Sequence, residues 1–247
     1  MNGLYVARNT IIVVAGDMES KEKVLRETRK YFSEIGKGNV RMKEKVIERQ
    51  KKPRSLIHYK KTDQTHFCLG VRTYNIFHPK RYVLEVMNAI LGSSFSSRLF
   101  IQVRERRGLA YYIKSSSENY TDAGYLVVQA GVDNNKVDEA IKVILAEFNK
   151  LKDKQVSKKE LKKGKEYLKG KMLLDLESSD EVAFWLGTQE ILKKKILSVK
   201  QIFKNIDKVT SEDIKRVASD IFQNEKLNLA VIGPFKDSDK LEKILKI

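Results

Sequence analysis

Two stretches near opposite ends of the chain follow one pattern: an apolar run, a glycine, a short acidic loop and an amphipathic segment. The first, "TIIVVAGDMESKEKVL", begins at Thr10, and the second, "LNLAVIGPFKDSDKLEKIL", begins at Leu227. An apolar, β-branched run that ends at a glycine predicts a buried strand, and the segment after it predicts a helix. The chain is therefore either the tail of one unit followed by a whole second unit, or a single sheet flanked by two such pieces.

The pattern favours the first arrangement, because only nine residues precede the first strand and a lone strand cannot bury both of its faces. We therefore expect residues 1–36 to be a strand and helix that close a preceding, related half. Residues 37–54 form a polar, basic linker, and residues 55–247 form a domain of their own.

The order of elements is typical of an α+β fold. Strands are predicted over residues 10–15, 56–59, 65–74, 111–116, 125–130 and 227–232. Helices are predicted over residues 18–34, 79–92, 137–151, 199–206 and 211–222, at the C-terminal end, and over a segment with Phe95, Leu99, Phe100 and Val103 on its buried face. Capping-box spacing at Ser157/Glu160 and Ser178/Glu181 marks two more helix starts. We expect a mostly antiparallel sheet covered by helices.

The chain carries a formal net charge of +17, with the surplus in residues 37–54, 152–171 and 193–200. A basic surface can bind nucleic acid through phosphate contacts. These clusters hold few aromatic residues and no recognised nucleic-acid motif, so solvated lysine-rich helix faces are the better interpretation. An acidic partner or substrate is also compatible with this charge, and nucleic acid is not the expected partner.

Two further features bear on location. No stretch approaches the ~20 apolar residues that a membrane helix needs, so no membrane association is expected. The lone Cys68 cannot form an internal disulfide, which favours a reducing compartment such as the cytoplasm.

The stretch "LGSSFSSRLFIQVRERRGLAYYIKSSSENYTDAGYLVVQAGVD" resembles the C-terminal half of M16 (insulinase, pitrilysin and processing-peptidase) proteins. Three further stretches follow in the family's order, "ESSDEVAFWLGTQEIL", "VTSEDIKRVASDIF" and "LNLAVIGPF", while "LYVARNTIIVVAGDM" resembles the segment that closes the N-terminal half. The resemblance implies a LuxS/MPP-like metallohydrolase fold, with two related halves enclosing a chamber for peptide substrates. It also implies a zinc site, His-x-x-Glu-His plus a distal Glu, in the other half.

That zinc motif does not occur in this sequence. His58, His66 and His78 stand in "HYKKT", "HFCLG" and "HPKRY", and none is followed by the required Glu and His. A zinc site needs about three converging protein ligands. We therefore expect no metal or other cofactor in this chain, and zinc in a partner half.

In many family members an arginine and a tyrosine seven residues later come from the C-terminal half and face the zinc. Arg104 and Tyr111 have this spacing, across Gly108, in "RERRGLAY". A guanidinium can clamp a substrate carbonyl, and a phenol can donate to the oxyanion that forms when an amide is attacked by water. The resemblance thus assigns both residues to substrate and oxyanion binding. The alternative is structural: Arg104 on an exposed helix face and Tyr111 packed under the sheet.

These features leave three functions open. The first is a non-zinc, substrate-binding half of an M16-type peptidase, inactive alone, whose partner is a zinc-bearing half or a second copy of the chain. The second is a non-catalytic scaffold or peptide-binding subunit of the same fold. The third is a basic nucleic-acid-binding module. The Arg–Tyr pair favours the first.

Overall fold

A computed structural model describes residues 4–40, 43–236 and 239–247. The chain divides into two compact units, which are described separately. One comprises Met1–Lys45 and Gly170–Ile202, and the other comprises Val46–Lys169 and Phe203–Ile247.

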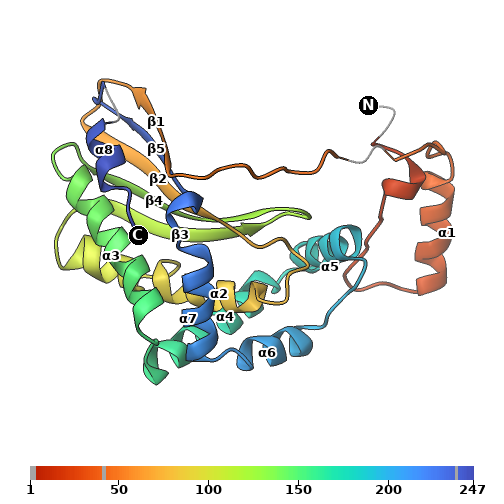
Figure 1. The fold of residues 1–247 in the computed structure, drawn as a ribbon. Coiled ribbons are helices and arrows are strands. Elements are labelled where there is room, and N and C mark those ends of the chain that lie inside the picture. Colours follow the sequence, from red (N-terminus) through yellow and green to blue (C-terminus); the bar gives the residue numbers. More distant parts are fainter. Residues whose placement is uncertain (1–3, 41–42, 237–238) are drawn as a thin grey trace. The chain divides into compact units, whose positions relative to one another are not determined.

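The second unit is built on one five-stranded sheet (Figure 1). Its strands are β1 (Arg54–Tyr59), β2 (Gln64–Thr73), β3 (Ala110–Asn119), β4 (Gly124–Asp133) and β5 (Leu227–Gly233), in the order β1-β5-β2-β4-β3. β1 pairs with β5 in parallel, and every other pairing is antiparallel. The last strand of the chain therefore lies between the first two.

Helices cover one face of this sheet (Figure 1). They are α2 (Arg81–Leu91), the π-helical turn η2 (Phe100–Glu105), α3 (Val137–Asp153), α7 (Ser211–Ile221) and α8 (Asp239–Ile244). Alternate strand residues such as Leu69, Leu126 and Leu229 are buried beneath them, next to the stacked rings of Phe148 and Phe222, whose centroids are 4.2 Å apart. Residues between these positions, such as His66, Cys68 and Tyr125, are exposed, so the other face of the sheet is open.

The remaining elements in the described residues are two short turns, two helices of the first unit and two helices that cross from one unit to the other. They are the 3-10 turns η1 (Ala7–Asn9) and η3 (Asn224–Lys226), the helices α1 (Lys21–Phe32) and α5 (Ser179–Lys193) of the first unit, and the crossing helices α4 (Lys158–Asp175) and α6 (Val199–Asp207). The mixed, mostly antiparallel sheet with helices confirms the predicted α+β class.

Two local expectations were wrong. Residues 10–15 form no strand and lie outside the five-stranded sheet, because no strand in the described residues offers them backbone partners. Phe95 is 79% exposed rather than buried, and its ring meets that of Phe100 in a T-shaped contact.

Both helix starts marked by capping-box spacing are confirmed. The box at Ser157 and Glu160 forms its hydrogen bonds. Ser178 is the N-cap residue of α5, although its side chain makes no capping hydrogen bond.

A further capping box begins α7. The Thr210 hydroxyl accepts a hydrogen bond from the Asp213 N–H at 3.1 Å, and the Asp213 carboxylate accepts one from the Thr210 N–H at 3.0 Å. Thr210→Ala should lower the free energy of unfolding by about 1 kcal/mol, the usual cost of losing an N-cap. Ser219→Ala, at an exposed interior position of the same helix, should change it little; urea denaturation of both variants measures the difference.

Candidate functional site

The segment that bears Arg104 is anchored at its start. Arg98 donates two hydrogen bonds to Glu160, from Nε at 2.8 Å and from Nη2 at 3.1 Å. Such a bidentate pair fixes orientation as well as distance. The preceding serine loop is also held, since Tyr167 donates to the Ser93 carbonyl at 2.7 Å and Lys163 to the Ser96 carbonyl at 2.5 Å. The position of η2 is therefore fixed by the Arg98–Glu160 pair just before it and by the contacts of the serine loop with Lys163 and Tyr167.

The chain reverses direction immediately after Arg104. Arg106 N–H donates to the Ile101 carbonyl at 2.9 Å, a π-helical bond, and Gly108 N–H donates to the Arg104 carbonyl at 3.1 Å. Gly108 has φ of +57°, the left-handed region that glycine adopts without a Cβ penalty. The backbone of Arg104 thus takes part in the turn that leads into β3.

The Arg104 side chain is exposed and has no polar partner among the described residues. Its guanidinium carbon lies 5.1 Å from the centroid of the Phe100 ring, a cation–π contact. It makes no hydrogen bond or ion pair with any residue that the structure describes. Its five N–H donors are consequently available to a ligand.

Tyr111 lies at an irregularity of the sheet. Ala110 pairs with Val132 and Tyr112 pairs with Gly131, so Tyr111 is the extra residue of a β-bulge. Bulges re-aim side chains and recur next to active sites. Tyr111 is 56% exposed, so the alternative in which it packs under the sheet is wrong. Tyr112, the next residue, is also exposed, at 41%.

The two residues singled out from the sequence therefore stand on either side of the Gly108 turn, both exposed to solvent. Within the described part of the chain, no hydrogen bond joins their side chains to each other. The structure therefore places the guanidinium of Arg104 before the Gly108 turn and the phenol of Tyr111 after it.

A second aromatic contact borders this turn. The Tyr112 hydroxyl lies 3.2 Å from His66 Nδ1, and the two rings stack with centroids 5.9 Å apart. Burial raises the pKa of the Tyr112 phenol. The sequence pattern suggested only an ordinary histidine at His66; its pairing with Tyr112 follows from sheet register across β2, β4 and β3, which the sequence does not display.

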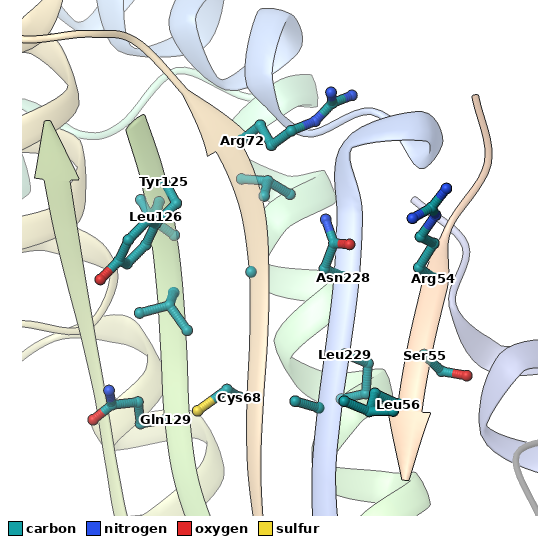
Figure 2. A pocket seen from close by; sticks show the side chains of 14 residues that line it. Arg54, Ser55, Leu56, Cys68, Arg72, Tyr125, Leu126, Gln129, Asn228 and Leu229 are labelled. Carbon is teal, nitrogen blue, oxygen red and sulfur yellow. The ribbon is translucent and has the colours of Figure 1, made fainter. Parts of the chain in front are cut away.

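The open face of the sheet carries a hollow of about 620 Å³ (Figure 2). It lies over the first halves of β1, β5 and β4 and the second half of β2. Its described lining residues include Arg54, Leu56, Cys68, Gly70, Arg72, Tyr125, Val127, Gln129, Asn228 and Ala230. The hollow was not predicted from the sequence.

A polar cluster at the end of β2 has a structural role. The Tyr74 hydroxyl donates to Asp220 of α7, and the His78 ring stacks on Tyr74 at 4.0 Å. Burial alone would raise the pKa of Asp220, but the Tyr74 hydrogen bond and the charges of Lys226 and Lys80 hold it below its usual value. Burial also raises the pKa of Tyr74, and its bond to Asp220 adds to this. These contacts tie α7 to β2.

The three histidines do not converge. His58 lies on β1, His66 contacts Tyr112 and His78 contacts Tyr74. Among the residues that the structure describes, no group of three or more His, Cys, Asp or Glu side chains could hold a metal ion. The donor set of the described residues does not fit zinc.

No described helix is long and apolar enough to cross a membrane.

Comparison with known proteins gives a consistent result. The chain matches the family model described as "Peptidase M16 inactive domain" over residues 1–168. It is 32% identical over 235 residues to YmxG of Bacillus subtilis (strain 168), named as an uncharacterized zinc protease, and the match covers 95% of this chain and 56% of that protein. It is 26% identical over 211 residues to YmfF of the same strain, named as a probable inactive metalloprotease, covering 85% and 49%.

A solved structure has the same fold. The crystal structure of a peptidase M16 inactive domain from Pseudomonas fluorescens superposes with a TM-score of 0.78 at 20% identity, covering 88% of this chain and 52% of that one. At this identity the likeness shows the fold alone. The chain spans about half the length of the curated relatives named above.

Proposed function

Since the chain belongs to the peptidase M16 inactive-domain family, we propose that it is the substrate-binding half of a peptide-hydrolysing chamber whose other half holds zinc. That other half is a separate polypeptide or another part of a longer chain. The boundaries we propose are a closing segment over residues 1–36, a linker over 37–54 and the chamber half over 55–247.

One observation carries this proposal: an exposed Arg104 and an exposed Tyr111 flank a turn that is closed by the Arg104 carbonyl. Arg104 clamps a substrate carbonyl with two N–H donors, which fixes the position of the peptide. Tyr111 donates its hydroxyl to the oxyanion that develops as the amide is attacked. Zinc, held by the partner half, supplies the activation of water; neither residue of this chain needs to lose a proton.

The first unit offers a surface for that partner half. Ile12, Val14, Tyr31 and Phe32 are each 39% or more exposed, and with Met18 and Val24 they line an apolar hollow of about 550 Å³ along α1. Contiguous exposed apolar patches mark interaction sites. The occupant that we propose is the zinc-bearing half, because this segment resembles the piece that closes it.

Tyr31→Ser should weaken this association by about tenfold or more, since a large aromatic at an interface often contributes over 1 kcal/mol. Arg26→Ser, on the same helix but outside the hollow, should leave the affinity nearly unchanged. Analytical ultracentrifugation of each variant with the partner half measures the difference. Equal affinities for the two variants would place the contact elsewhere.

Complementation tests the proposed function. The purified chain alone should cleave no peptide and bind no stoichiometric zinc by mass spectrometry. Mixing it with a polypeptide that carries the His-x-x-Glu-His half should produce hydrolysis that depends on the concentrations of both. Hydrolysis by the zinc half alone, unaltered by this chain, would contradict the proposal.

A second candidate is a scaffold that assembles with other M16 halves without contributing to hydrolysis. The similarity to YmfF, named as a probable inactive metalloprotease, favours it. The same assay separates the two functions, because a scaffold would assemble with the zinc half without Arg104 or Tyr111 affecting turnover.

A further inference from the structure

The hollow on the open sheet face is formed by small residues surrounded by larger ones. Sheet register places Gly70 of β2 between Asn228 of β5 and Val127 of β4, and Ala230 beside Cys68. A Cβ added at Gly70 would lie 2.8 Å from the Leu126 carbonyl oxygen, so the backbone itself keeps this position empty. The floor of the hollow is therefore fixed by the sheet.

The chemistry of the rim differs from that of the floor. Figure 2 shows Arg54 and Arg72 at the same end of the hollow, and Cys68 and Gln129 toward the other. The apolar surface comes from Leu56, Val127 and the Tyr125 ring. None of the described lining residues is a carboxylate. The hollow thus combines an apolar surface with two arginines on its rim.

The two arginines are not equivalent. The Arg72 guanidinium already has partners within the protein: Nη1 donates to Glu48 Oε2 at 2.9 Å, and Nη2 donates to the Glu225 carbonyl at 3.2 Å. The exposed side chain of Arg54 makes no hydrogen bond or ion pair with any described residue. Arg54 is therefore the cation that can receive an anionic group, while Arg72 maintains the local structure.

The hollow lies at a defined distance from the Arg–Tyr turn. Gly70 is four residues along β2 from His66, which contacts Tyr112 next to Tyr111. At a rise of about 3.4 Å per residue and a spacing of about 4.8 Å between strands, Gly70 lies roughly 17 Å from Tyr112, which is two strands away on β3. This is the span of about five residues of an extended peptide, so a side chain about five residues from the cleaved bond would reach the hollow.

We propose that this hollow is a specificity subsite for an extended peptide in which an apolar side chain and a carboxylate stand two residues apart and so face the same side, with the apolar group over Gly70 and Ala230 and the carboxylate at Arg54. This inference rests on the proposed function and names its substrate class. The carboxylate can come from Asp or Glu, or from the peptide C-terminus.

Cys68 gives a direct measure of occupancy, because it is the single cysteine of the chain and it lines the hollow. The probe is an acetylated, amidated hexapeptide with Leu and Glu two residues apart, and its partners carry Gln at the position of Glu. Its matched partners are the Leu–Gln peptide with an amidated end and the Leu–Gln peptide with a free C-terminal carboxylate. The chain alone is alkylated with iodoacetamide at alkaline pH, since burial raises the pKa of the Cys68 thiol.

The Leu–Glu peptide should slow alkylation of Cys68 and bind about three- to fivefold more tightly than its amidated Leu–Gln partner, the range of an exposed ion pair. Stronger binding by the free-carboxylate peptide would identify the C-terminus as the source of the anion. Arg54→Gln should abolish the preference, while Lys61→Gln, an exposed charge outside the hollow, should retain it. Ala230→Leu should fill the hollow and remove protection by every peptide.

Unchanged alkylation in the presence of bound peptide would overturn the subsite. So would equal effects of Arg54→Gln and Lys61→Gln. Alkylation that slows with protein concentration alone would show that a second copy covers this face, which also overturns it. The alkylation assay needs no zinc half, so a negative result there would not contradict the proposed function. Likewise, a failure of the complementation assay would not change the interpretation of the alkylation result.

Discussion

Tyr111→Phe is expected to lower kcat by about 10²–10³ when the chain is assayed with a zinc-bearing half, the usual cost of losing one oxyanion donor. The change removes only a hydroxyl from a side chain that is 56% exposed, so folding and assembly should be unaffected. KM should change little, because the bond to the oxyanion forms as the carbonyl becomes tetrahedral. Steady-state hydrolysis of one peptide by wild type and variant measures both constants.

Tyr112→Phe is the matched control. It removes the neighbouring hydroxyl, which contacts His66 rather than the turn. Its kcat should stay within a few-fold of wild type. Full activity of Tyr111→Phe, or equal losses in the two variants, would assign both tyrosines a structural role.

Arg104→Ala should lower kcat/KM by about ten- to a hundredfold, because hydrogen bonds to a charged group contribute about 1.5–3 kcal/mol. The loss should be divided between KM and kcat, since a clamp on the substrate carbonyl is made in the ground state and persists in the transition state. Its only described side-chain contact is with Phe100, so little stability should be lost.

Arg106→Ala separates a specific site from a generally basic face. Arg106 is exposed and lies two residues from Arg104. Arg104 lies within the π-helical turn η2, whereas Arg106 is the C-cap residue that follows it. Its removal should have little effect on kcat/KM. Small and equal losses at both positions would favour non-specific attraction of the substrate.

The fold was largely predictable because the strands of the second unit obey simple alternation. In β2, Phe67, Leu69 and Val71 are buried and the residues between them are not, which is the alternation of apolar with small or polar residues in the sequence. Helix positions followed apolar spacing and local capping chemistry, such as the box at Ser157. These signals are local, so a single sequence contains them.

The errors came from interactions that are not local. Residues 10–15 have the composition of a buried strand, but a strand also needs neighbours for its backbone, and composition does not supply them. Phe95 was assigned to a buried face on spacing alone, whereas its segment is a loop held through Ser93 and Ser96.

Only part of the candidate site could be predicted from the sequence. The spacing of Arg104 and Tyr111 was recognisable through family resemblance, and Gly108 indicated the turn. The bulge at Tyr111, the contact of His66 with Tyr112 and the hollow around Gly70 all depend on strand order and register. Since β5 inserts between β1 and β2 from the far end of the chain, no local pattern could have revealed that surface.

The most direct test of the proposed function is a crystal structure of this chain assembled with a zinc-bearing half and a phosphonate peptide, whose phosphonyl oxygen mimics the oxyanion. We expect Tyr111 Oη about 2.7–3.1 Å from that oxygen, with the Arg104 guanidinium on the adjacent peptide carbonyl. A structure in which both side chains lie beyond hydrogen-bonding reach of the peptide, with the open sheet face turned away from the metal, would contradict the proposal.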